Sequence, residues 1–303
     1  MGAARALSNS TKGNLGLSYS DGRKALAAMV ARLLLKSPTD IRFCPFLVSP
    51  GHQMNRYLIV ANWKMNLLRE PAVAFCHKLA EQVLSVPHVS QDIVICPQAP
   101  LIDAVISAVG ETSIFVGAQD CHWQLNGPFT GDVSPVLLSE LGCKYVIIGH
   151  SERRANHDET DADIRRKAEA LLEEGVIPIV CVGETAKQRD DGQTADVIAR
   201  QIVKSVPDFA SSNNIVIAYE PLWAIGTGQT PTLEAIQAAH DAVRDAFSIA
   251  TGQKADSLRI LYGGSVKAAN AASIFSIRGV NGALVGGASL DVDQFWQIIE
   301  SCA

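Results

Sequence analysis

The chain has 303 residues, of which 48% are hydrophobic and 19% are charged, and its formal net charge is −5 at pH 7. This length allows one large domain or two smaller ones, and the composition is that of a soluble globular protein. No uninterrupted apolar run reaches the roughly 20 residues that a membrane-spanning helix needs, which argues against a membrane protein. The net negative charge gives no support to nucleic-acid binding.

Residues 1–54 differ in composition from the rest of the chain. They hold seven Lys or Arg against two Asp, a net charge of +5, which leaves −10 for the remainder. They include one amphipathic stretch, RKALAAMVARLLLK, at residues 23–36. A basic, acid-poor segment is typical of a mitochondrial or plastid transit peptide, and an upstream extension or a misplaced start codon before Met54 is the alternative. We expect a poorly ordered extension, residues 1–54, followed by one folded domain, residues 55–303.

Short apolar runs rich in β-branched residues recur from Tyr57 onward. Each is nearly continuous in apolar residues, as expected for parallel strands that are covered on both faces. The predicted strands are eight, at residues 57–64, 92–98, 113–120, 144–152, 177–184, 215–221, 258–264 and 282–287.

Helical patterns lie between these runs. The segment 161–175 has acidic residues in its first turn and Gly175 as the expected C′ residue, and the segment 230–247 offers Thr230 as N-cap and Pro231 at the first helical position. Eight alternations of strand and helix predict an α/β fold, a closed (β/α)8 barrel, rather than an open doubly wound sheet. The N-terminal extension then lies outside the barrel.

The seven cysteines are odd in number and include no CxxC motif and no paired Cys/His spacing. We interpret them as buried or surface thiols in a reducing compartment, in preference to a disulfide framework or a zinc site.

Polar residues stand where the predicted strands end. In a (β/α)8 barrel these strand ends converge on one mouth, where the chemistry takes place. The polar residues are Asn62, Lys64, Gln119, His150, Glu152, Glu184 and Glu220, and glycines follow the last two strands.

Three of these side chains suit proton transfer next to a carbonyl. Glu220 is ionised at neutral pH and can accept a proton from a carbon that an adjacent carbonyl acidifies. His150 and Lys64 can polarise that carbonyl and stabilise the enediolate oxygen. This chemistry needs neither a metal nor an organic cofactor.

The glycines predict a phosphate site. YGGSVK and LVGGASL both place Gly-Gly just after a strand, where backbone N–H groups can approach a phosphate, although each alone could be a tight turn. The segment PLWAIGTG after Glu220 combines a stiff hinge with small residues, as expected for a lid that excludes water from the site.

The stretches ANWKMN, FTGDVSP, IIGHSERR, CVGET, AYEPLWAIGTG, YGGSVK and GALVGGASL together resemble the triosephosphate isomerase family, over about residues 56–303. The resemblance implies a cofactor-free triose-phosphate isomerase of glycolysis and gluconeogenesis. Its substrates would be D-glyceraldehyde 3-phosphate and dihydroxyacetone phosphate, and its intermediate an enediolate.

The resemblance also implies a role for each matching residue. Glu220 is the implied base, His150 the neutral electrophile, Lys64 the cation, Asn62 a further donor and Glu152 a further acidic residue. The implied phosphate-binding residues, besides Asn62 and Lys64, are Gly226, Ser265, Gly286 and Gly287.

A homodimer is implied as well. The loop at residues 121–135, with Phe129 and Thr130 near its tip, is similar to the dimer loop of this family, which places Thr130 near the partner's site. The chain departs from the common pattern at Leu67, where a glycine is frequent, and at Asp120, Asp132 and Asn281, none of which is a catalytic group.

Two alternative functions are weighed against the isomerase. Another sugar-phosphate barrel enzyme would want a Schiff-base lysine or clustered metal ligands, and a non-catalytic barrel scaffold would have lost Glu220 or His150. Neither fits these residues. We expect a cytoplasmic enzyme, or an organellar one if residues 1–54 are a transit peptide.

Overall fold

The computed structural model describes residues 56–225 and 229–302, so the predicted extension, residues 1–54, lies outside the described residues. Eight strands form a closed barrel in chain order, and every neighbouring pair is parallel, including the β1–β8 pair that closes the ring. The strands are β1 (Leu58–Asn62), β2 (Asp92–Cys96), β3 (Ile114–Ala118), β4 (Tyr145–Ile148), β5 (Ile177–Val182), β6 (Val216–Tyr219), β7 (Arg259–Tyr262) and β8 (Gly282–Val285). The predicted (β/α)8 barrel is confirmed.

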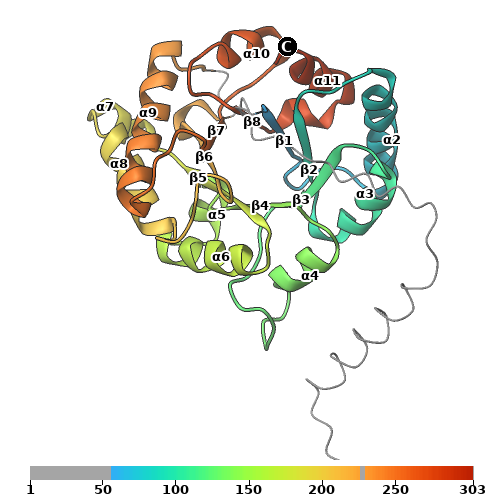
Figure 1. Ribbon diagram of the computed structural model, residues 1–303, viewed down its shortest axis with the longest axis horizontal. Coiled ribbons are helices and arrows are strands. Elements are labelled where there is room, and N and C mark those ends of the chain that lie inside the picture. Colours follow the sequence, from blue (N-terminus) through green and yellow to red (C-terminus); the bar gives the residue numbers. More distant parts are fainter. Residues whose placement is uncertain (1–55, 226–228, 303) are drawn as a thin grey trace, which may run out of the picture. The chain divides into compact units, whose positions relative to one another are not determined.

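Helices surround the barrel (Figure 1). The α-helices are α2 (Arg69–Ser85), α3 (Ile102–Val109), α4 (Pro135–Glu140), α5 (Ser151–Asn156), α6 (Asp161–Glu173), α7 (Ala186–Asp190), α8 (Thr194–Ser205), α9 (Leu233–Thr251), α10 (Ala268–Phe275) and α11 (Val292–Glu300). Three short 3-10 helices follow strands β2, β6 and β8, namely η1 (Ala99–Leu101), η2 (Leu222–Ala224) and η3 (Gly287–Leu290).

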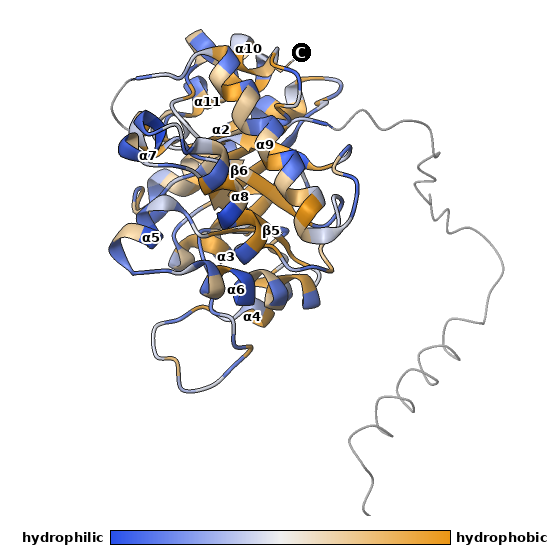
Figure 2. Cartoon of the chain, turned by 90° about the vertical axis from the view of Figure 1, so that its left-hand side faces the viewer, coloured by the Kyte–Doolittle hydropathy of each residue, from blue (hydrophilic) through white to orange (hydrophobic). Residues whose placement is uncertain are grey.

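Alternate residues of most strands enter two separate cores. Leu58 and Val60 of β1 pack inside the barrel, whereas Ile59 and Ala61 pack outward beneath the helices. Figure 2 shows hydrophobic strands β5 and β6 among helices that mix hydrophilic and hydrophobic residues. Because both faces are covered, a barrel strand must be apolar throughout, which explains the continuous apolar runs of the sequence.

The predicted helix ends are confirmed for α6 but not for α9. Helix α6 is capped by Thr160 and is followed by Gly175 at φ 71°, as expected. The predicted cap of the next segment is wrong. Helix α9 begins at Leu233, and its N-cap is Thr232, whose hydroxyl accepts a hydrogen bond from the Ala235 N–H at 3.2 Å. Both Thr230 and Thr232 offer a capping hydroxyl, so the residue types alone did not fix which one is used.

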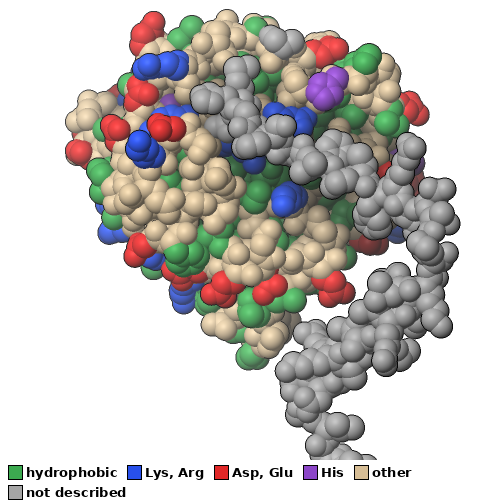
Figure 3. All heavy atoms as spheres, in the orientation of Figure 1, with side chains coloured by type: hydrophobic (Ala, Val, Ile, Leu, Met, Phe, Trp, Pro, Cys, Tyr) green, Lys and Arg blue, Asp and Glu red, His purple; other side chains and the backbone are tan. Residues whose placement is uncertain are grey.

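The composition also led to predictions about the cysteines and about membrane-spanning helices. The six described cysteines are free and buried, and Cys44 lies outside them. Across the described part of the chain, every helix is too short or too polar to cross a membrane. On the face that Figure 3 displays, acidic and basic side chains are intermingled.

Candidate active site

Most of the predicted site residues border one cavity of about 360 Å³. Asn62, His150 and Glu220 are buried at its base, being 5%, 6% and 2% exposed. The cavity is also lined by Lys64, Ile225, Gly263, Gly264, Ser265, Val266, Lys267, Leu284, Gly286, Gly287, Ala288 and Gln294. Gly226 lies outside the described residues, and Glu152 borders a neighbouring cavity that shares Asn62, Lys64 and His150.

Glu220 directly follows β6, and two groups hold its carboxylate. Its Oε1 lies 2.9 Å from His150 Nε2, and its Oε2 accepts a hydrogen bond from the Ser151 N–H at 3.1 Å. Strands β5 and β6 approach closely here, because a Cβ at Gly183 would lie 1.7 Å from the carbonyl oxygen of Glu220. Only glycine permits that approach, so Gly183 fixes where the backbone of Glu220 leaves the barrel.

His150 follows β4 and is the N-cap of α5. Its Nδ1 accepts a hydrogen bond from the Glu152 N–H at 3.2 Å. In a neutral ring whose Nδ1 accepts, the single proton resides on Nε2, which donates to Glu220. The start of α5 thus fixes the tautomer of His150.

The pKa values of this pair are coupled through the hydrogen bond. Burial raises the pKa of Glu220, but His150, the Ser151 N–H and Lys64 lower it more, so it lies below its ordinary value. Burial lowers the pKa of His150, but the Glu220 carboxylate raises it more, so it lies above its ordinary value. Glu220 is therefore ionised at neutral pH, and the upward shift of the His150 pKa depends on Glu220 staying beside it.

Lys64 is held in a left-handed backbone conformation, with φ 51°. Its N–H donates to Asn62 Oδ1 at 3.1 Å, and its carbonyl oxygen accepts from Gln119 Nε2 at 2.9 Å. Its Nζ lies 2.5 Å from Glu152 Oε1. A left-handed non-glycine residue is strained, and its occurrence between two strand-end amides indicates that the ammonium position is specified.

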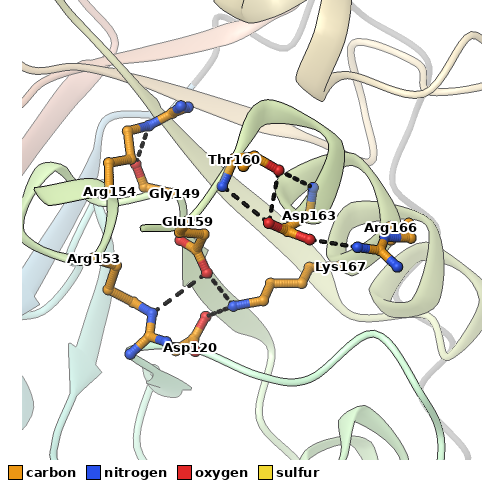
Figure 4. Close-up of polar contacts among 9 residues, drawn as sticks. All are labelled: Asp120, Gly149, Arg153, Arg154, Glu159, Thr160, Asp163, Arg166 and Lys167. Atoms are coloured by element: carbon orange, nitrogen blue, oxygen red, sulfur yellow. Dashed lines mark hydrogen bonds and ion pairs between the residues drawn. The ribbon is translucent and has the colours of Figure 1, made fainter. Parts of the chain in front are cut away.

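Two arginines anchor α5, the helix that supplies the Ser151 and Glu152 N–H groups. Arg153 pairs with Asp120 at 2.9 Å and lies 3.5 Å from Glu159, and Figure 4 shows both carboxylates beside Lys167 of α6. Arg154 donates to the carbonyl oxygens of Gly149 and Cys181 at 2.8 and 3.1 Å. These contacts tie the helix to β5 and α6 and so hold His150 in place.

The predicted phosphate glycines Gly286 and Gly287 border the same cavity as Glu220. Gly286 and Gly287 connect β8 to η3, and Ser265 follows β7. A Cβ at Gly264 would lie 2.2 Å from Tyr262 Oη, so only glycine fits there. Gly286 is next to Lys64, because a Cβ at Gly286 would lie 3.6 Å from Lys64 Cε.

Two groups that shape the site were not predicted from the sequence. The Ser151 N–H that holds Glu220 is a backbone donor, which leaves no residue-type signal. Glu184 was noted only as a strand-end residue, yet its buried Oε1 accepts from Tyr219 Oη at 3.1 Å and from Trp223 Nε1 at 2.8 Å. It therefore ties the residue before Glu220 to the hinge after it, a link that the neighbouring apolar pattern does not reveal.

The loop at residues 121–135 lies away from the cavity and extends outward before α4 (Figure 1). Phe129 is 37% exposed and stacks on His122, with ring centroids 4.2 Å apart. Thr130 borders a second cavity of about 550 Å³, together with Met65, Gln98 and Asp120.

The fold and the cavity together define a class of protein, a (β/α)8 barrel enzyme with a buried carboxylate and an imidazole at its mouth. The profile of the triosephosphate isomerase family matches residues 57–302. Triosephosphate isomerases of Rhodopseudomonas palustris (strain BisA53) and Ruegeria sp. (strain TM1040) are each 47% identical to the chain; each alignment covers 82% of this chain and 98% and 99% of the relatives. A crystal structure of triosephosphate isomerase from Bartonella henselae superposes with a TM-score of 0.74 at 37% identity, covering 81% of this chain and 98% of that one.

The chain belongs to the triosephosphate isomerase family. It is an isomerase, and membership in this family decides against the alternatives of another sugar-phosphate enzyme and of a non-catalytic scaffold.

Proposed function

We propose that Glu220 carries the isomerisation of D-glyceraldehyde 3-phosphate and dihydroxyacetone phosphate by moving one proton between C1 and C2. The observation that supports this most is a carboxylate that is 2% exposed yet borders an open cavity, with an imidazole at 2.9 Å. The lowered pKa keeps this carboxylate ionised at neutral pH and so able to accept a proton, and its burial, which raises the pKa, strengthens it as a base once it leaves His150 and the Ser151 N–H.

The base must leave its present partners before it can reach the substrate. Glu220 bonds to His150 and to the Ser151 N–H, and both bonds would break as the carboxylate turns toward the cavity. That move frees the Nε2–H of His150 to donate to the substrate carbonyl. It also removes the carboxylate that raises the pKa of His150 most, while burial and Lys64, which lower that pKa, remain, as does Glu152, which raises it less. The imidazole then acts as a neutral electrophile.

Lys64 and Asn62 are, in this proposal, the further polar side chains that contact the substrate. The Lys64 ammonium stabilises the enediolate oxygen and attracts the phosphate, and Asn62 holds the Lys64 backbone through the 3.1 Å bond and adds a side-chain donor. Glu152 pairs with Lys64 and so orients the ammonium.

The phosphate lies, in this proposal, against Ser265, Gly286 and Gly287, which border the cavity. Gly226 of the lid would add a further N–H. The lid begins at η2, where Glu184 accepts from Trp223. Closing it would exclude water and so protect the enediolate phosphate from losing its phosphate group.

We also propose a homodimer in which Thr130 reaches the site near Asn62 and Lys64 of the partner subunit. In support, Met65, which borders the second cavity, and the nearby Leu68 in sequence are 87% and 79% exposed, and the loop bearing Phe129 extends outward. Apolar side chains exposed in this way are typical of interaction surfaces.

A cytoplasmic location fits this proposal, because the six described thiols are free, as in a reducing compartment. An organellar location is the alternative if residues 1–54 act as a transit peptide.

A coupled assay of glyceraldehyde 3-phosphate isomerisation tests the proposal on two proteins, the full-length chain and a chain that starts at Met54, both with a chelator present. Equal activity in both would support a metal-independent isomerase whose extension is dispensable for catalysis. Folded protein without activity in either form would contradict it.

A further inference from the structure

A second lysine borders the active-site cavity and has no role in the proton transfer. Lys267 follows Ser265 by two residues, at the start of α10. It is exposed, whereas Asn62, His150 and Glu220 are buried. Lys267 therefore lies toward the rim of the cavity, on the side where the phosphate is proposed to bind.

Of the described residues, those on the buried side of the cavity offer the substrate phosphate no unpaired positive side chain. Three charged side chains border the cavity, namely Lys64, Glu220 and Lys267. The ammonium of Lys64 is paired with Glu152 at 2.5 Å. With His150 neutral, Lys64, Glu152 and Glu220 together sum to −1. A phosphate monoester carries a charge of about −1.5 to −2 at neutral pH, so Lys64, paired with Glu152, does not balance it alone.

Lys267 is the side chain that can offset this negative charge, since its single positive charge brings the sum to zero. Among the residues that the structure describes, it has no ion-pair partner within 4.0 Å, unlike Lys64. Its backbone is fixed, because the Lys267 N–H donates to Asn270 Oδ1 at 2.8 Å, and Asn270 Nδ2 donates to the Ser265 carbonyl oxygen at 3.0 Å. The same asparagine thus holds Lys267 and Ser265 together at one side of the cavity.

We propose that Lys267 recognises the phosphate dianion of the substrate and speeds its capture, an inference that rests on the proposed phosphate site. A lysine suits this task, because a point charge on a flexible stem attracts an anion over a distance without fixing its orientation. Orientation remains with the backbone N–H groups of the Gly-Gly turns. Lys267 is a binding residue that takes no part in the proton transfer.

The test compares Lys267→Met and Lys267→Arg with Lys254→Met in the full-length protein. Lys254 precedes β7 and Lys267 follows it, so the two methionine variants remove the same charge at opposite ends of one strand. At low ionic strength, Lys267→Met should lower kcat/KM about five- to twentyfold, mainly through KM, and Lys267→Arg should restore most of it. The deficit should shrink as salt is raised to roughly 0.5 M, because salt screens charges of this kind.

Binding of inorganic phosphate, measured by calorimetry, gives a readout that needs no catalysis. Its Kd should rise in Lys267→Met and stay at the wild-type value in Lys254→Met. An active wild-type enzyme with unchanged KM and phosphate Kd in Lys267→Met would overturn the inference alone, whereas a wild type that neither isomerises the substrate nor binds phosphate would overturn the proposed site with it.

Discussion

At Glu220, one carboxylate is held by an imidazole and a backbone N–H that belong to the same turn after β4. The sequence predicted Glu220, His150 and Lys64 at one mouth, because residues at the carboxyl ends of barrel strands must converge. It could not predict that the Ser151 N–H would donate a hydrogen bond to Glu220, since almost any residue at that position has a backbone N–H. Nor could it predict the tautomer of His150, which depends on the Glu152 N–H.

Glu220→Asp tests the geometry of proton transfer at the residue scale. Withdrawing the carboxylate by about one methylene should lower kcat by a factor of about 10² to 10³, because a displacement near 1 Å costs that much at a reacting centre. Coupled kinetics give kcat, and circular dichroism checks that the fold is intact. Normal turnover by this variant would show that Glu220 is not the base.

At the scale of elements, helix α9 was predicted from the sequence, but its N-cap and its contact with the segment before β8 were not. The sequence predicts the helix but misplaces its N-cap by two residues, because neighbouring threonines compete. It gives no sign that His240 of α9 is fully buried, or that its Nδ1 lies 3.3 Å from the Gly279 carbonyl oxygen in the segment before β8. That contact joins elements 39 residues apart, which a local pattern cannot register.

His240 predicts a specific sensitivity to acid. Burial lowers its pKa to about 4, from an ordinary value of 6.5. Above pH 6.5 His240 is neutral in both the folded and the unfolded state, so it adds no pH dependence to stability. Below that pH the unfolded chain binds a proton at His240 but the folded chain does not, so the free energy of unfolding falls. The loss should reach roughly 3 kcal/mol at about pH 4.

Urea unfolding of the wild type and of His240→Gln between pH 7.5 and about pH 4 measures this term. Glutamine can donate to the Gly279 carbonyl oxygen but does not titrate, so the free-energy difference between the two proteins should shift in favour of the variant as the pH falls. Parallel pH profiles would show that His240 is not the acid-sensitive group.

For the whole molecule, eight apolar runs predicted the closed barrel, because the number of strand and helix alternations fits that fold. The sequence could not predict the two cavities, whose volumes of about 360 and 550 Å³ depend on how loops from separate strands come together. Positions that depart from the common family pattern gained meaning only in the structure. Leu67, for example, adopts φ 66°, a conformation that glycine adopts without strain.

The proposed homodimer makes a prediction at this scale. The chain mass is 32.4 kDa, so a dimer has twice that mass, 64.8 kDa. Phe129→Asp should shift the mass measured by light scattering toward 32.4 kDa, because a carboxylate at the loop tip would be buried unpaired in the interface. Isomerase activity should fall at least about tenfold, since a misplaced site residue costs that much or more. A monomeric wild type with full activity would contradict the dimer.

The most direct test of proton transfer by Glu220 is to run the isomerisation of glyceraldehyde 3-phosphate in deuterated water and to locate deuterium in the product. A carboxylate that takes a proton from one carbon and returns one to its neighbour exchanges with solvent, so dihydroxyacetone phosphate should carry deuterium at C1 in a measurable fraction of molecules. Product without any deuterium would contradict an enediolate whose proton is held by a carboxylate that exchanges with solvent, and would favour direct passage of hydrogen between the carbons.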